Sequence, residues 1–115
     1  MKSYTDIEKS KELAEILPIE RADMTWVEGE WGEPIVGKIM KSPDEDYTFI
    51  PCWSLAALLE VIGVECRMEK TPLDQSGEFT YSMVDDHNSI RTYECDNPVD
   101  ACVEMIYELK DKDLL

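Results

Sequence analysis

Apolar and charged residues alternate along the stretch Val64-Glu65-Cys66-Arg67-Met68-Glu69, a pattern typical of a strand with one buried face. A second alternating run, Phe79 to Met83, follows a polar connector that contains proline and glycine. A third, less regular run covers Ser89 to Cys95, behind the polar turn 85–88. Connectors this short join antiparallel neighbours, so the sequence predicts a three-stranded meander over residues 64–95 with one solvated face.

Three stretches with a helical spacing of apolar residues accompany this meander: residues 5–17, 52–62 and 98–110. The first begins with the capping box Thr5-Asp6-Ile7-Glu8, with Thr5 as its N-cap, and ends before Pro18. The second is apolar almost all round, which indicates a buried helix with Pro51 in its first turn and Gly63 as its C-cap. The third begins at Asn97, an N-cap that is followed by proline.

Weaker strand signals lie between the first two helices, at Met24–Val27, Ile35–Met40 and Tyr47–Ile50. The element order therefore predicts an α+β fold, in which an antiparallel sheet packs against the three helices. The meander would form most of this sheet, and the weaker N-terminal strands would complete it. A length of 115 residues predicts a single domain over residues 1–115.

The chain is strongly acidic, with 26 Asp and Glu against 11 Lys and Arg and a net charge of −15. This charge argues against binding nucleic acid or an anionic membrane surface, because both need cations on the protein. The longest apolar run, Leu55 to Val64, has half the length that would span a bilayer, and no apolar leader is visible. We therefore expect a cytoplasmic protein with reduced thiols, whose partner of choice is a protein with a basic surface.

Motifs for catalysis and metal binding are weak. His87 is the only histidine, and the sequence places none of the four cysteines beside it: Cys52, Cys66, Cys95 and Cys102. The cysteine spacing does not match a zinc site, and the acidic turns 44–46 and 85–88 do not match a calcium loop. We expect no catalytic residue, no metal site and no cofactor.

Aromatic residues next to acidic ones suit an interface with a basic protein. Trp26 lies in a weak strand, and Trp31 lies in a loop rich in glycine and glutamate. The candidate interaction residues are Trp26, Trp31, Glu28, Glu30 and Glu33. The alternative for Trp31 is that it folds back over the core, and Trp53 is expected to be buried.

Several segments resemble one family. The stretches Pro51 to Leu59 and Asp96 to Ile106, together with Tyr4 to Ser10 and Leu13 to Pro18, resemble parts of small uncharacterised proteins of phages and mobile elements of Bacteroides-like gut bacteria. The resemblance implies an intracellular bacterial setting, with a phage or mobile-element origin. It assigns no activity to any residue.

Three functional hypotheses remain. The first is a small accessory protein that binds a basic-surfaced protein partner. The second is a DNA mimic that inhibits a host nucleic-acid-binding protein, which the charge of −15 makes physically possible. The third is a small enzyme that uses a Cys/His or a carboxylate pair. Homodimerisation through an uncovered sheet face or edge also stays open.

Overall fold

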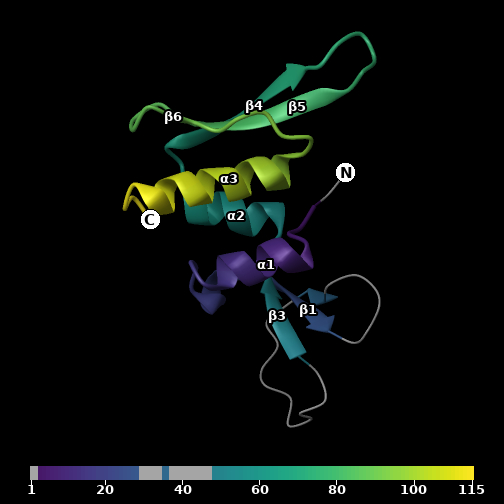
Figure 1. Ribbon diagram of the computed structural model, residues 1–115, viewed down its shortest axis with the longest axis vertical. Coiled ribbons are helices and arrows are strands. Elements are labelled where there is room, and N and C mark those ends of the chain that lie inside the picture. Colours follow the sequence, from purple (N-terminus) through teal and green to yellow (C-terminus); the bar gives the residue numbers. More distant parts are fainter. Residues whose placement is uncertain (1–2, 29–34, 37–47) are drawn as a thin grey trace.

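Two antiparallel three-stranded sheets lie on either side of a layer of three helices (Figure 1). The computed structural model describes residues 3–28, 35–36 and 48–115. The strand order is β2-β1-β3 in one sheet and β4-β5-β6 in the other. The α+β class is therefore confirmed. The N-terminal strands form a sheet of their own, whereas we expected them to extend the meander.

The meander consists of β4 (Cys66–Pro72), β5 (Phe79–Asp85) and β6 (Ile90–Arg91). β5 lies in the centre, and its register with β4 runs from Cys66 opposite Asp85 to Pro72 opposite Phe79. The predicted meander is confirmed, but β4 begins two residues late, and β6 covers only two residues of the run predicted from Ser89 to Cys95, where Cys95 forms an isolated bridge with Tyr81. Val64, which was expected on the buried face, is fully exposed in the turn after Gly63.

The face of this sheet that was expected to be solvated is partly covered by its own charged side chains. Ser82 and Val84 are buried there, opposite Glu69 and Arg67 of β4. Arg91 of β6, which also lies opposite Val84, holds the Glu69 carboxylate at 2.7 Å. Strand β5 is therefore buried on both faces of the sheet, because ion-paired side chains of β4 and β6 lie next to its small side chains. An alternating sequence pattern alone does not predict this burial.

The smaller sheet consists of β1 (Met24–Glu28), β2 (Ile35–Val36) and β3 (Thr48–Cys52). The strand signals at 24–27, 35–40 and 47–50 are thus confirmed within the described residues; 37–47 lie outside them. A short 3₁₀ helix, Ile19–Arg21, precedes β1.

Helix α1 (Ile7–Ala14) is capped by Asp6, whose carboxylate accepts a hydrogen bond from the Lys9 amide at 2.8 Å. The prediction of Thr5 as the N-cap was wrong by one residue, and the helix ends at Ala14 and not at Leu17 as predicted. Thr5 is fully buried, and its hydroxyl lies 2.7 Å from that of Ser10 and accepts a bond from the Trp53 amide at 3.2 Å. The hydroxyl is therefore used in the core and not at the helix end.

Helix α2 (Leu55–Ile62) begins three residues later than predicted, because Pro51 and Cys52 belong to β3 and pair with β1. Among the described strands, β3 lies at the edge of its sheet, where a proline is tolerated because its missing N–H is not needed for pairing. Ser54 is the N-cap instead, and accepts a hydrogen bond from the Ala57 amide.

The same helix is also less enclosed than predicted. It buries Leu58 and Ile62, but Leu59, which was expected on the buried face, is exposed. The predicted C-cap is confirmed at Gly63. Its φ of 89° is a backbone conformation that glycine adopts readily and that residues with a Cβ rarely adopt.

Helix α3 (Pro98–Asp111) is confirmed as predicted, with the side chain of Asn97 accepting from the Asp100 amide at 2.9 Å. The helix packs against both α2 and β5, so its apolar stripe forms the centre of the core. Among the described residues, no helix has both the length and the apolar character that a membrane crossing requires.

Candidate functional site

Trp26 has a structural role. Its ring is half-buried, its Nε1 donates to the Thr5 carbonyl at 2.9 Å, and it meets Tyr4 edge-on with ring centroids 5.7 Å apart. Through these contacts, β1 packs against the segment that precedes α1. Trp53 is fully buried, as predicted.

Of the other candidate interaction residues, the described structure places only the backbone of Glu28. Glu28 ends β1 opposite Thr48, and its side chain lies outside the described part of the chain. Trp31, Glu30 and Glu33 also lie outside it.

Cys66 and His87 line one pocket of about 450 Å³, together with Asp85. Burial, together with the charges of Asp85 and Glu65, raises the pKa of the Cys66 thiol to about 11. The thiol is therefore protonated near neutral pH and is a weak nucleophile. The Asp85 carboxylate accepts bonds from the backbone amide and the side-chain amide of Asn88, at 3.1 and 2.8 Å, which stabilises the turn after β5.

The remaining three thiols are also held in the protonated form. Burial raises the pKa of Cys52, and it raises the pKa of Cys102 to about 12. Burial and nearby carboxylates do the same for Cys95. Reactive thiols have a lowered pKa, whereas burial is the largest influence at these four sites and acts in the opposite direction. No group of three or more metal-ligating side chains occurs among the described residues.

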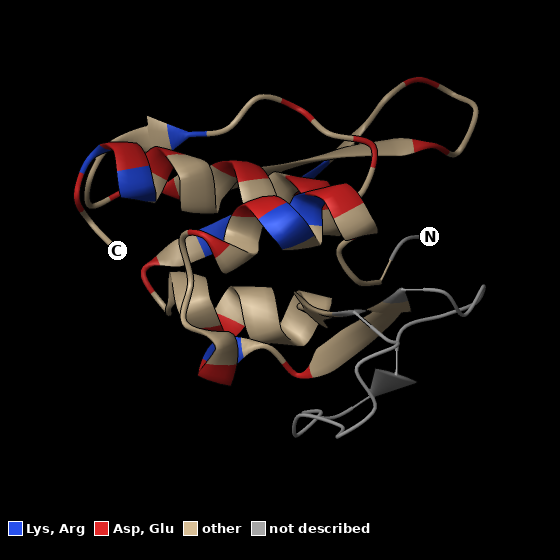
Figure 2. Cartoon of the chain, turned by 60° about the horizontal axis from the view of Figure 1, so that its bottom comes forward, with Lys and Arg blue, Asp and Glu red and all other residues tan. Residues whose placement is uncertain are grey.

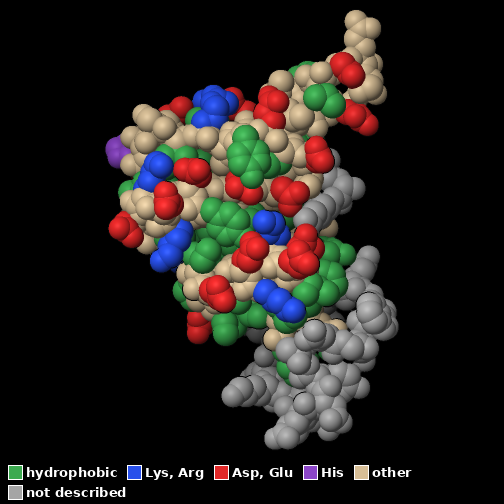
Figure 3. Space-filling model, in the orientation of Figure 1, with side chains coloured by type: hydrophobic (Ala, Val, Ile, Leu, Met, Phe, Trp, Pro, Cys, Tyr) green, Lys and Arg blue, Asp and Glu red, His purple; other side chains and the backbone are tan. Residues whose placement is uncertain are grey.

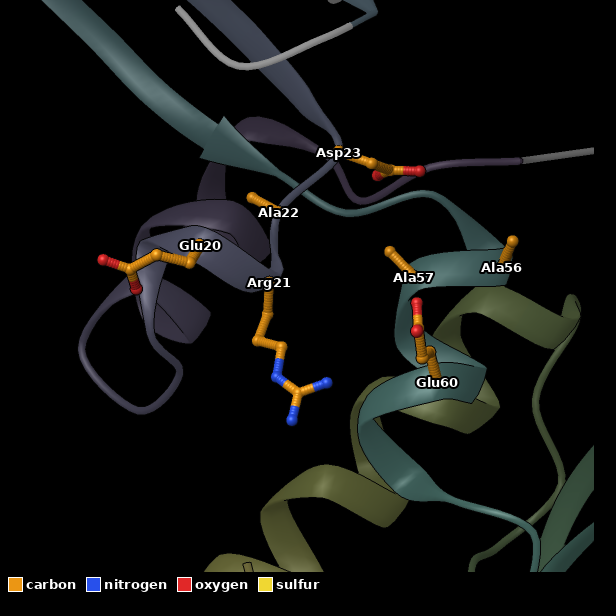
Figure 4. A pocket seen from close by; sticks show the side chains of 7 residues that line it. All are labelled: Glu20, Arg21, Ala22, Asp23, Ala56, Ala57 and Glu60. Carbon is orange, nitrogen blue, oxygen red and sulfur yellow. The ribbon is translucent and has the colours of Figure 1, made fainter. Parts of the chain in front are cut away.

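A second pocket, of about 460 Å³, lies between the 3₁₀ helix and α2 (Figure 4). Arg21 reaches into it, and Glu60 of α2 lies on the opposite side. Asp23, at its upper edge, accepts bonds from the amide and the hydroxyl of Ser54 at 2.9 and 2.5 Å. Its carboxylate is therefore engaged in holding the start of α2.

The most distinctive surface is a groove of about 250 Å³ beside the N-terminal half of α3, which we call the acidic groove. The residues that line it are Lys9, Tyr93, Glu94, Cys95, Asp96, Asp100, Val103 and Glu104. They include four carboxylates and one ammonium group. On this face, exposed hydrophobic side chains over α1 and α3 are surrounded by acidic side chains with basic ones among them (Figure 3).

Tyr93 projects from the segment between β6 and α3, and 67% of its surface is exposed. A hydrogen bond to Glu104, the burial of its hydroxyl and the charges of Glu104 and Asp100 raise its pKa. The pKa of Cys95 is raised mainly by burial, and the negative charges of Glu104, Asp100 and Asp96 raise it further. Both groups thus experience a negative potential inside the groove.

Among the described lining residues, Lys9 is the one cation of the groove, and it is already matched. Its Nζ lies 3.5 Å from the Glu12 carboxylate and 5.4 Å from the centre of the Tyr107 ring. The Tyr107 hydroxyl donates to the same carboxylate, which lowers the pKa of Glu12 and ties α3 to α1. The cation of the groove is therefore paired with a carboxylate outside the lining, while the Asp100 carboxylate of the lining accepts a hydrogen bond from the Asn97 side chain at 2.8 Å.

The sequence interpretation missed this groove. A signal was present, because Asp100 and Glu104 are four residues apart and so share one face of the predicted helix. Lys9 of α1 and Tyr93 of the segment before α3 reach the groove only through the tertiary fold. No local sequence pattern predicts that they lie beside this face of α3.

Comparisons of this chain with protein-family models, with curated proteins and with solved structures each gave no match.

Proposed function

We propose that this chain is a small accessory protein that binds a basic segment of a partner protein in the acidic groove. One observation carries the proposal: four carboxylates and a mostly exposed tyrosine line the same groove, and the one cation among the described lining residues is already paired with Glu12. A volume of about 250 Å³ lies below the range of small-molecule sites, which begins at about 300 Å³, and suits side chains that protrude from a partner.

The chemistry of the groove favours arginine or lysine as the inserted side chain. A guanidinium group can donate to the carboxylates of Glu94 and Glu104 and lie against the ring of Tyr93. The net charge of −15 adds long-range attraction and speeds the encounter with a basic partner. The bacterial cytoplasmic setting and the phage or mobile-element origin remain part of this proposal, and rest on the resemblance of the segments around α2 and α3.

The two alternative hypotheses have less support. A DNA mimic needs a continuous array of negative charge, whereas acidic and basic side chains alternate along α1 and near the end of α3 (Figure 2). An enzyme based on a thiol needs an activated cysteine, and all four thiols have raised pKa values.

The experiment is affinity capture from a bacterial host with three forms of the full chain. The wild type is compared with the groove variant Glu94→Gln/Glu104→Gln and with the matched variant Glu20→Gln/Glu60→Gln. Both variants remove two negative charges, but only the first removes them from the acidic groove.

We expect the wild type and the matched variant to retain the same partner, and the groove variant to lose it. Added salt should weaken the capture, because the attraction is between exposed charges. Equal retention by both variants contradicts the proposal. So does equal loss, since that outcome reports the total charge and not the groove.

A further inference from the structure

Strand β4 has one unpaired edge. Among the described residues, β5 is the only strand that pairs with it, and β4 is the outer strand in the order β4-β5-β6. An exposed edge of seven residues is a template for another strand unless charge, proline or a covering segment prevents pairing. Proline occurs in β4 only at its last residue, Pro72.

The hydrogen bonds of β5 determine which atoms of β4 point outward. The amide and carbonyl groups of Tyr81 bond to Cys95 on the β6 side, and those of Met83 face the same side, toward Thr92. Since backbone groups alternate in direction along a strand, Thr80, Ser82 and Val84 direct theirs to β4.

The partners of these three residues on β4 are Thr71, Glu69 and Arg67. Their backbone groups are therefore used within the sheet. By the same alternation, the amide and carbonyl groups of Cys66, Met68 and Lys70 point away from β5, toward the open edge.

We propose that a second copy of this chain pairs antiparallel with this edge, with Met68 opposite Met68 of the second copy. The two meanders would then form one six-stranded sheet around a two-fold axis. In this register, Cys66 lies opposite Lys70 in each copy, and the three outward-facing residues of both strands exchange backbone hydrogen bonds.

The charges of β4 select this register. With Met68 opposite Met68, Arg67 of each copy lies opposite Glu69 of the other, at the closely spaced, non-hydrogen-bonded positions where side chains interact best. Backbone direction restricts pairing to shifts of two residues. A shift one way places Glu69 opposite Glu69, and a shift the other way places Arg67 opposite Arg67, so both put like charges together.

The surroundings of the edge also suit a second copy. Arg67 and Arg91 balance Glu69 and Asp86 on the outer face of the sheet, which makes this face near neutral in a chain of net charge −15. On the other face, the half-buried Met68 side chains would meet at the two-fold axis. Pairing over so short a segment buries less than a standard interface, so we expect a dissociation constant on the order of micromolar.

The test is sedimentation velocity of the full chain over a series of concentrations. We expect a monomer–dimer equilibrium in the wild type. In the variant Met68→Pro we expect a monomer, because proline removes an N–H that only the second copy uses, and edge strands tolerate proline at such positions. Circular dichroism checks that each variant is folded.

Charge variants test the register. Arg67→Glu and Glu69→Arg each place like charges opposite one another twice, and each should weaken the homodimer about tenfold. A mixture of the two variants restores both opposite-charge pairs, so a heterodimer should form. Arg21→Glu makes the same charge change outside the sheet and should leave the dimer unchanged.

A wild type that stays monomeric at every concentration overturns the proposal. A dimer that persists in Met68→Pro overturns the assignment to β4, and a mixture of charge variants without heterodimer overturns the register. None of these outcomes depends on the acidic groove, whose variants lie on α3 and the segment before it.

Discussion

Replacing Trp26 by phenylalanine separates a structural role of this side chain from a role in binding. Phenylalanine keeps an aromatic ring against Tyr4 but has no N–H to donate to the Thr5 carbonyl, a bond of 2.9 Å. Thr5 is fully buried, so water does not readily replace the lost donor. The net contribution of such a bond is about 1 kcal/mol.

Other groups near the Thr5 carbonyl limit the loss of stability. The hydroxyl of Ser10 and the thiol of Cys52 also approach the Thr5 carbonyl, both at 3.4 Å, so the oxygen keeps weak partners in Trp26→Phe. Trp26→Ala loses the ring contact and the half-buried surface as well, which brings the expected loss to about 3 kcal/mol.

Urea denaturation and thermal denaturation, both followed by circular dichroism, measure these losses. Trp26→Phe should lower the free energy of unfolding by about 1 kcal/mol and the melting temperature by about 4 °C, with partner capture unchanged. A Trp26→Phe variant that is as stable as the wild type but fails to capture the partner would refute the structural role.

Three further predictions concern other parts of the fold. Gly63→Ala should cost about 1–3 kcal/mol in thermal unfolding, from backbone strain alone, since no described atom lies within 4 Å of the added Cβ. Asp85→Asn should reduce the loss of stability at acidic pH, measured as the urea midpoint of unfolding at a series of pH values. The hydrogen-bonded carboxylate has a lowered pKa, so its contribution is present above its unfolded value of about 3.9 and is lost as pH falls through the folded value. Glu104→Gln should lower the raised pKa of Cys95 and speed its alkylation at mildly alkaline pH, whereas Glu20→Gln should leave that rate unchanged.

Elements whose signals are local could be predicted from the sequence. Helix α3 carries its N-cap, its first-turn proline and its apolar stripe within a few residues, and the structure places it where those signals indicate. The strands of the meander follow from alternation and short connectors in the same way.

Features that depend on distant partners could not be predicted. Pro51 and Cys52 fit the pattern of a helix start, and only their pairing with β1 assigns them to a strand. The hydrogen bond between Trp26 and the Thr5 carbonyl could not be predicted either, because the two residues are 21 positions apart in the sequence. The acidic groove could not be predicted either, because its residues are distant in sequence. Helix α1 contributes Lys9 to a surface that α3 and the segment before it mainly form.

If the proposal is right, the acidic groove, and not the total charge, recognises the basic partner. Titration calorimetry of the captured partner against the wild type and the two double variants tests it most directly. Loss of two exposed charge contacts should weaken binding by about tenfold in Glu94→Gln/Glu104→Gln, while Glu20→Gln/Glu60→Gln should bind like the wild type. Equal affinities in the two double variants would contradict the claim.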